Sequence, residues 1–153
     1  MTAPTRDSER KTMQSTRPAL RLTHEAALKA VAGAAAQAGS FGIGQNIAVV
    51  DEGGNLLAFL RMDGAKLLSR ETALSKAISA ASHRQPTARL DPELELKLAI
   101  AAGGRLTNLE GGLPILFDGA CVGGIGVGSG TGKQDIACAR AGLAAIGADL
   151  PEA

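Results

Sequence analysis

Apolar residues recur at helical spacing in four stretches of the chain. In the first, small apolar residues from 26 to 38 follow Thr23, a typical N-cap, and end near Gly39. In the second, over 66–82, apolar residues share one side and charged residues lie elsewhere, which predicts an amphipathic helix packed on a sheet. Its apolar positions are Leu67, Leu74, Ala77, Ile78 and Ala81, and its charged positions are Arg70, Glu71 and Lys76.

The third and fourth helices are marked by their first residues. Asp91-Pro92-Glu93 combines an N-cap, a proline at the first helical position and an early acid, and the short helix that follows stops before Gly103. Thr131 and Gln134 have the T-x-x-Q spacing of a capping box. The last helix therefore begins after Thr131, and we expect it to end at Gly147.

Two pairs of β-rich runs predict two hairpins. The first pair covers 45–51 and 55–62 and is separated by a glycine-containing loop. The second covers 113–117 and 120–127, on either side of Asp118-Gly119, a dipeptide that tolerates the two positive φ angles of a type I′ turn. Hairpins with helices before, between and after them indicate an α+β fold on a central antiparallel sheet, because parallel strands would need crossovers between single strands.

The N-terminal segment has a different character from the rest of the chain. Residues 1–21 are polar, rich in Thr, Ser and Arg, and contain no periodic apolar face. They include no apolar run approaching the roughly 20 residues of a membrane span and no secretory signal pattern. We expect a mobile N-terminal arm, a domain over residues 22–150, no membrane partner and a cytoplasmic location.

Composition narrows the classes of function. The chain has 153 residues, one domain's worth, and its 16 Lys and Arg against 15 Asp and Glu leave a net charge of +1. This balance and the near absence of aromatic residues, three Phe with no Trp or Tyr, argue against a nucleic-acid partner. Cys121 and Cys138 have no spacing typical of a zinc site or a disulfide framework, so we expect both to be small buried residues of a protein in a reducing compartment.

The glycine-rich stretch over 123–135 leads into a helix N-terminus, where anions are attracted. Its spacing fits neither G-x-x-x-x-G-K-[ST] nor G-x-G-x-x-G, so a phosphate loop is disfavoured. Two interpretations stay open: the turn over 128–132 binds a small carboxylate, or the glycines serve close packing of a helix on the strand.

Candidate ligands and charged site residues are few. His24 and His83 are the two histidines, and His24 is the better metal ligand because the first turn of a helix favours a neutral imidazole. Met62 is a candidate thioether partner for a haem iron. The charged residues placed near turns, strand ends or glycine loops, where sites are commonly built, are Arg61, Asp63, Lys76, Arg84 and Glu110.

Several blocks of sequence resemble one known family. They are LTHEAALKAV (22–31), IAVVDEGGNLLAFLRMDGA (47–65), SKAISAASHRQPT (75–87), GGLPILFDGACVGGIGVGSG (111–130) and QDIACARAGLAAI (134–146). In this order they are similar to the GlcG/HbpS-like family, the domain-of-unknown-function 336 family, which includes the C-terminal domain of PduO-type proteins.

The resemblance implies a profilin-like or roadblock-like fold and self-association into dimers or larger homo-oligomers. Some family members bind haem, and a histidine in the first helix of PduO-type domains is the proposed haem ligand, a region that His24 occupies here. On this basis His24 is the candidate axial ligand and the candidate metal ligand, and Arg61, Lys76 or Arg84 are candidates to pair with haem propionates.

Three functions remain open. The first is a haem or other tetrapyrrole-binding protein, in haem handling or redox sensing. The second is a catabolic enzyme or accessory that binds a small organic acid at Arg61 and the turn over 128–132, with Asp63 or His24 as the proton-transfer group. The third is a structural module whose glycine-rich sheet packs against identical subunits, with no catalytic constellation.

Overall fold

The computed structural model describes residues 14–152. Within that range the chain forms four α-helices and four β-strands in the order α1, β1, β2, α2, α3, β3, β4, α4. Their bounds are α1 His24–Ser40, β1 Asn46–Asp51, β2 Leu56–Arg61, α2 Ser69–His83, α3 Pro92–Ala101, β3 Gly112–Phe117, β4 Ala120–Gly128 and α4 Gly132–Ala145. The predicted α+β class is confirmed.

All strand pairs are antiparallel, and the sheet has the order β2-β1-β4-β3. Each predicted hairpin is present. The two hairpins are joined by the pairing of β1 with β4, which runs from Asn46 opposite Gly128 to Asp51 opposite Gly123. Asp118 and Gly119 have φ of 49° and 79°, the positive values that a type I′ turn requires. The second hairpin therefore turns where the sequence predicts.

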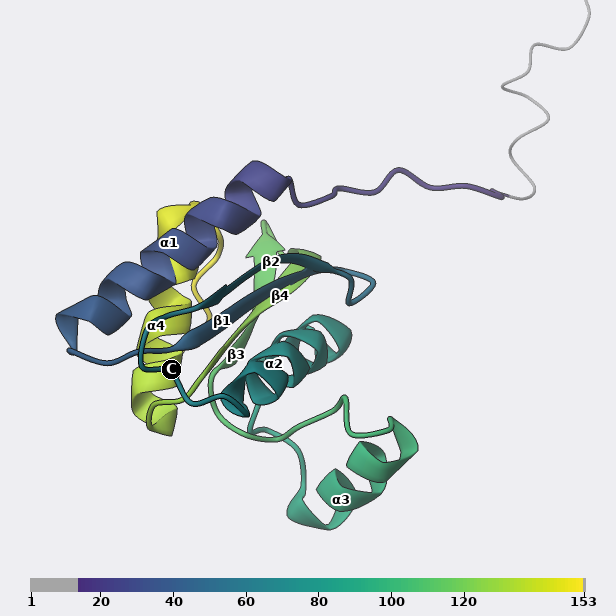
Figure 1. The fold of residues 1–153 in the computed structure, drawn as a ribbon. Helices are drawn as coiled ribbons and strands as arrows, with labels where there is room; N and C mark the ends of the chain where they lie inside the picture. Colours follow the sequence, from purple (N-terminus) through teal and green to yellow (C-terminus); the bar gives the residue numbers. More distant parts are fainter. Residues whose placement is uncertain (1–13, 153) are drawn as a thin grey trace, which may run out of the picture.

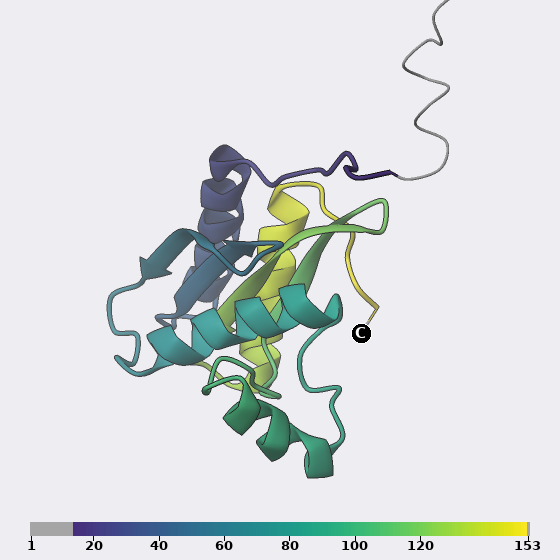
Figure 2. The same cartoon turned by 90° about the vertical axis from the view of Figure 1, so that its right-hand side faces the viewer.

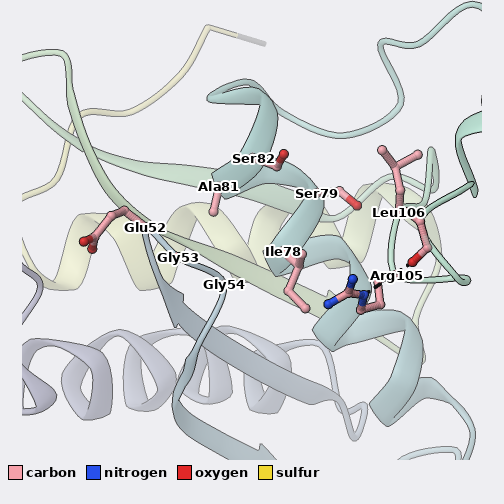
Figure 3. Close-up of a pocket in the computed structure, with 10 residues that line it drawn as sticks. Glu52, Gly53, Gly54, Ile78, Ser79, Ala81, Ser82, Arg105 and Leu106 are labelled. Atoms are coloured by element: carbon pink, nitrogen blue, oxygen red, sulfur yellow. Dashed lines mark hydrogen bonds between the residues drawn. The ribbon is translucent and has the colours of Figure 1, made fainter.

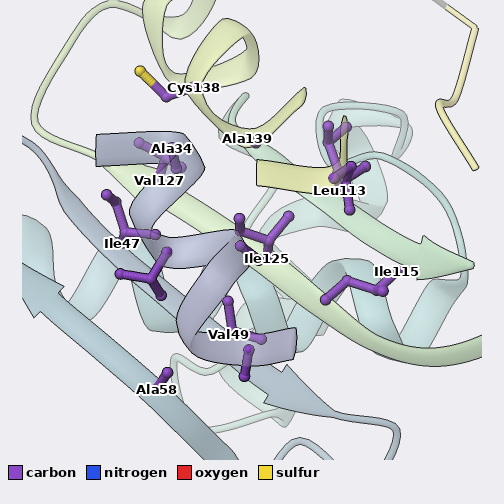
Figure 4. Close-up of a cluster of buried hydrophobic side chains, with 14 of the residues drawn as sticks. Ala34, Ile47, Val49, Ala58, Leu113, Ile115, Ile125, Val127, Cys138 and Ala139 are labelled. Carbon is purple, nitrogen blue, oxygen red and sulfur yellow. The ribbon is translucent and has the colours of Figure 1, made fainter. Parts of the chain in front are cut away.

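Helices cover both faces of the sheet (Figure 1). The α1 and α4 helices pack together on one face, and α2 lies along β4 and β1 on the other. The larger core lies between the sheet and the α1–α4 pair and includes Leu143. Figure 4 shows Ile47, Val49 and Ile125 of this core. The smaller core under α2 is formed by Ala48, Val50, Ala73, Ala77 and Ala81.

The glycines of β4 bring α2 close to the sheet. A Cβ atom on Gly126 would overlap the carbonyl oxygen of Ala73, and one on Gly124 would overlap that of Ala77. Both glycines therefore serve close helix packing, as one of the two interpretations of this stretch proposed. The short distance also explains why the residues of α2 that face the sheet are alanines.

Three predicted helix caps are confirmed. The Thr23 hydroxyl accepts a hydrogen bond from the Ala26 N–H at 3.1 Å, and the Asp91 carboxylate accepts one from the Glu93 N–H at 2.9 Å. Thr131 and Gln134 form the complete capping box at the start of α4. Each cap satisfies backbone donors that the first helical turn leaves free.

The start of α2 differs from the prediction. The helix begins at Ser69 rather than near Lys66, because the Lys66 backbone is held by two contacts with other segments. Its N–H donates to the Ser129 hydroxyl at 2.9 Å, and its carbonyl accepts from the Asn46 side chain at 2.9 Å. Leu67 consequently lies outside the helix and is 56% exposed, so its predicted place on the packed face is wrong.

Lys76 is the second correction to this helix. The apolar pattern placed it away from the packed side, yet it is only 4% exposed. The third helix is also unlike an ordinary core helix, because α3 has no buried residue.

The first 13 residues of the predicted arm, 1–21, lie outside the described residues, and the rest, 14–21, form neither helix nor strand. None of the helices in the part of the chain that the structure describes has the length and apolar character needed to cross a bilayer.

Candidate functional site

His24 lies at the first position of α1 and faces solvent. Its ring makes no hydrogen bond to any residue within 14–152. Leu28, one turn further along α1, and Leu20, in the segment before the helix, are 59% and 65% exposed. Leu28 is one helical turn from His24 and Leu20 lies four residues before it in the sequence; we call His24, Leu20 and Leu28 the His24 surface.

A shallow apolar hollow begins next to this surface. Its volume is about 270 Å³, and its walls come from the segment before α1, from α1 itself and from the β3–β4 hairpin. The lining residues are Leu20, Arg21, Leu22, Thr23, Ala26, Phe117 and Val122. Arg21 is the one cationic side chain among them. The hollow therefore pairs an apolar wall with a single positive charge.

A buried polar cluster lies at the opposite end of the sheet. The Lys76 ammonium donates to the Asp135 carboxylate at 2.9 Å and to the Val127 carbonyl at 2.7 Å. The other carboxylate oxygen of Asp135 accepts from the Gln45 side chain at 2.9 Å and from the Gly130 N–H at 3.1 Å. These contacts tie together α2, β4, α4 and the residue before β1.

The buried Cys138 thiol lies beside the cluster and has a raised pKa. Burial raises the pKa of Cys138, a hydrogen bond from Gln45 lowers it, and the nearby Asp135 charge raises it, with a net upward shift. A thiol with a raised pKa is a weak nucleophile at neutral pH. Both cysteines are free; Cys138 is buried as predicted and has surroundings that favour a structural role, whereas Cys121 is half-buried, so the prediction that it is buried is wrong.

An open cavity of about 540 Å³ lies over the polar cluster and is lined by residues that include Lys66, Lys76, Glu110 and Asp135. Its wall contains Ser129, whose φ of 105° is rare for a residue other than glycine. The Glu110 carboxylate lies against Gly132 at the start of α4, where a Cβ atom would overlap it. Glu110 would therefore repel a carboxylate ligand bound at this end of α4.

A third cavity, of about 300 Å³, lies between the β1–β2 loop, the end of α2 and the segment after α3 (Figure 3). Glu52 and Arg105 supply its charged side chains, and Ser79 and Ser82 supply hydroxyl groups. It contains no histidine or cysteine and therefore no strong ligand for a transition metal.

The structure does not bring the six predicted site residues together. His24 lies at the end of the sheet that carries the β3–β4 turn, on the α1 face. Arg84 follows α2 near the same end but on the α2 face, is exposed and has a φ of 55°.

The other predicted site residues lie at the opposite end of the sheet. Arg61 pairs with Asn46, and Met62, which follows it, donates its N–H to the Gln45 carbonyl. Asp63 comes next in the chain, and Lys76 belongs to the buried polar cluster. Met62 packs against the core. With 17 residues and a rise of about 1.5 Å per residue, α1 separates the His24 end from the Met62 end by about 24 Å.

Sequence reasoning missed several residues of both regions. Asp135 is the fourth residue of α4 and resembles an ordinary acid of a first helical turn. Its partner Lys76 lies in a distant segment, so the sequence gave no sign that the two residues pair. Leu28 sits on the polar side of an alanine-faced helix, and this unpaired large apolar residue was the one available signal for an exposed surface.

Metal binding by several side chains is not supported at either region. Among residues 14–152 no group of three or more His, Cys, Asp and Glu side chains could hold a metal ion. An iron that is already held by four macrocycle nitrogens needs only axial ligands from the protein. The His24 surface contains one metal-binding side chain and does not form such a group.

Antiparallel hairpins covered by helices on both faces define a small α+β protein. Residues 22–144 match the model of the family described as haem degrading protein HbpS-like. The chain belongs to this family.

Curated relatives agree with this assignment. An uncharacterized 15.0 kDa protein from the dhaT-dhaS intergenic region of Citrobacter freundii is 38% identical over 93 residues, 57% of this chain and 65% of that protein. Protein GlcG of Escherichia coli K12 is 37% identical over 83 residues, 54% of this chain and 62% of that protein. The aligned segments thus span less than two thirds of these relatives.

Solved structures share the fold over most of the chain. Klebsiella pneumoniae protein ORFY has a TM-score of 0.82 at 29% identity and covers 90% of this chain and 98% of its own. A PduOC:heme complex has a TM-score of 0.79 at 25% identity, covering 87% and 100%. HbpS has a TM-score of 0.76 at 40% identity, covering 85% and 93%.

Proposed function

We propose that this protein binds haem and that His24 is the protein ligand to the iron. The observation that carries the proposal is the exposed His24 imidazole, which makes no hydrogen bond to residues 14–152, together with exposed Leu20 and Leu28 four positions before and after it in the sequence. The family assignment and the haem complex of the similar PduOC domain support the choice of ligand.

The chemistry of the His24 surface suits this ligand. Imidazole nitrogen is a common axial ligand of haem iron, and only the neutral ring can coordinate. When bound, the haem supplies an iron with a site for redox or oxygen chemistry, and the chain supplies the axial nitrogen and the apolar surface.

The size of the hollow determines how haem can lie on the protein. Ligand pockets that enclose a molecule of this kind measure roughly 300–1,000 Å³, whereas the hollow beside His24 measures about 270 Å³. The hollow would therefore enclose only part of a haem, and Leu20 and Leu28 would offer exposed apolar surface beside it. Arg21 is the cation placed to pair with a propionate.

Of the predicted propionate partners, none lies at this surface. Arg61 and Lys76 are at the far end of the sheet, and Lys76 is already paired with Asp135. Arg84 lies on the α2 face. We therefore assign the propionate contact to Arg21 in the proposal.

A titration with ferric haem tests this function. The protein has no Trp and no Tyr, so its own absorption is small, and binding is followed in the Soret band of haem. We expect saturable binding by the wild type, at least a tenfold loss of affinity in His24→Ala and no change in His83→Ala. His83 is the matched control because it is also exposed and, among residues 14–152, its ring has one hydrogen-bond partner, the Ser79 carbonyl at 3.2 Å.

Two results would contradict the proposal. Equal affinity in His24→Ala and the wild type, with both variants folded by circular dichroism, would remove His24 as the ligand. A wild-type signal that rises without saturation would show adsorption rather than a binding site.

A further inference from the structure

We propose that the open cavity over the buried polar cluster binds a small neutral polyhydroxy compound, a polyol or a sugar, and that one oxygen atom of this ligand accepts a hydrogen bond from the Lys76 ammonium. We call this space the Lys76 cavity. The proposal does not depend on haem binding, because the Lys76 cavity and His24 lie at opposite ends of the sheet.

Segments that are distant in the sequence contribute to the walls of the Lys76 cavity. They are the start of α2 with Lys66 before it, the turn between β4 and α4 with the first residues of α4, and residues 108–110. The chain after α3 returns along α2 (Figure 2), where the Thr107 N–H donates to the Ser79 hydroxyl at 3.0 Å, and this brings 108–110 to the cavity. The volume of about 540 Å³ lies within the roughly 300–1,000 Å³ of small-molecule sites.

The lining of the Lys76 cavity is rich in hydroxyl groups. Ser69, Thr72 and Ser129 contribute them, and Leu109 is the one described lining residue with a hydrocarbon side chain. The Thr72 hydroxyl donates to the Ser69 carbonyl at 3.1 Å, whereas the Ser69 hydroxyl makes no hydrogen bond to residues 14–152. The Ser129 oxygen accepts from the Lys66 N–H, which leaves its own O–H free to donate within that range. Such a wall suits a hydroxyl-rich ligand better than a hydrophobic one.

The Lys76 ammonium retains one donor for a ligand. An ammonium has three N–H groups, and within the described part of the chain two acceptors bind it, the Asp135 carboxylate and the Val127 carbonyl. Gly111 leaves space beside it, since a Cβ atom there would lie 3.1 Å from Nζ. Because a buried donor without an acceptor costs free energy, the third N–H favours an oxygen atom of a ligand, or of the water that the ligand displaces.

The charges of the lining favour a neutral ligand. Lys66 and Lys76 are balanced by Glu110 and Asp135, so the four charged side chains sum to zero. The two buried charges already neutralise each other at 2.9 Å. Lys66 and Glu110 are exposed, and neither forms an ion pair with another residue of 14–152. An anion would approach two carboxylates and a cation would approach two ammonium groups, whereas a neutral molecule meets neither repulsion.

Amide proton–nitrogen correlation spectra of the full chain test the site, with ethylene glycol, glycerol and xylitol as probes. We expect saturable shifts at the backbone amides of Ser69, Thr72, Gly130 and Gly132. The affinity should rise from ethylene glycol to xylitol because each added hydroxyl can meet a further polar group of the wall.

Three other probes separate a polyol site from other kinds of site. They are n-propanol for an apolar site, acetate for an anion site and glycine for a zwitterion site. Shifts that do not saturate with any polyol, equal binding of n-propanol and glycerol, or saturable binding of acetate or glycine alone would overturn the proposal.

Variants of the wall place the binding in the Lys76 cavity. We expect Ser69→Ala to lower the affinity for xylitol by at least about threefold through the loss of a hydrogen bond, and Lys76→Met with Asp135→Asn to abolish binding. Ser82→Ala is the matched control for Ser69→Ala, because Ser82 is exposed, makes no hydrogen bond to residues 14–152 and lies outside the Lys76 cavity. Circular dichroism verifies that each variant is folded.

The single variant keeps the test decisive if the double variant does not fold, because Ser69 takes no part in the buried ion pair. An unchanged xylitol affinity in folded Ser69→Ala, or an equal loss in Ser69→Ala and Ser82→Ala, would show that polyols do not bind in the Lys76 cavity.

Discussion

The Lys76 ammonium and the Asp135 carboxylate lie 2.9 Å apart, with side chains that are only 5% and 4% exposed. The pair joins α2 on one face of the sheet to α4 on the other. Asp135 also accepts from Gln45 and Gly130, and Lys76 donates to Val127, so the carboxylate and ammonium are compensated by several partners. The pair thus connects the two helical layers through the end of the sheet.

Breaking this pair on one side should strongly destabilise the fold. We expect Lys76→Met to lower the free energy of unfolding by about 3–5 kcal/mol, because it leaves a buried carboxylate without its cation. Lys76→Met combined with Asp135→Asn should cost much less than the sum of the two single variants, since no buried charge remains. Urea denaturation followed by circular dichroism measures these differences.

The exposed pair of Arg70 and Glu71 supplies the control. Its side chains are 57% and 67% exposed at a separation of 3.7 Å, so Glu71→Ala should change stability by less than about 1 kcal/mol. Two results would show that burial does not set the strength of the Lys76–Asp135 pair. One is an equal loss of stability in Glu71→Ala and Lys76→Met. The other is a double variant of Lys76 and Asp135 whose loss of stability equals the sum of the two single losses.

Asp51 should contribute a pH-dependent part of the stability. Burial acts to raise the pKa of its carboxyl, but hydrogen bonds from the Asn55 and Gly53 N–H groups and the Asn55 side chain lower it below the ordinary value of 3.8. The stabilisation is therefore fully present above pH 3.8 and is lost as the pH falls through the lower pKa of the folded state.

Melting temperatures measured from pH 7 down to pH 2 test this contribution. Asp51→Asn should melt below the wild type at neutral pH, and the difference should shrink at the acid end. Glu52→Gln is the control because its side chain accepts no hydrogen bond in the β1–β2 loop of the structure. A difference between Asp51→Asn and the wild type that stays constant with pH would contradict the prediction.

Two glycine substitutions should have opposite effects. Gly126→Ala would make a Cβ atom overlap the Ala73 carbonyl oxygen and push α2 from the sheet. We expect it to lower the free energy of unfolding by about 1–3 kcal/mol. Gly39→Ala meets no atom within 4 Å in α1 and should stabilise the protein by up to about 1 kcal/mol through helix propensity. Thermal unfolding compares the two, and a stabilised Gly126→Ala would refute the close packing of α2.

Local signals made most of the fold predictable from the sequence. Asp118-Gly119 indicates its turn because the backbone angles required there suit these two residues, and Thr131 and Gln134 cap α4 through contacts three positions apart. Such features depend on neighbours in sequence. The bounds of all four strands were predicted within one residue for the same reason.

The features that were mispredicted or missed depend on distant segments. Lys76 looks like a solvated helix residue until Asp135, 59 positions away, is folded against it. Leu67 fits a helical pattern, but the contacts of Lys66 with Asn46 and Ser129 hold this segment outside the helix, which begins at Ser69. His24 and Met62 were candidates to ligate the same haem iron because of their side-chain chemistry. Only the fold shows that they lie near opposite ends of α1.

The most direct test of haem binding through His24 is the absorption spectrum of ferric haem bound to His24→Tyr. An axial ligand sets the electronic state of the iron, so replacement of a nitrogen ligand by a phenolate should move the Soret band and the long-wavelength bands while the haem stays bound. We expect this shift in His24→Tyr and a wild-type spectrum in His83→Tyr. A His24→Tyr spectrum and affinity identical to those of the wild type would contradict ligation by His24.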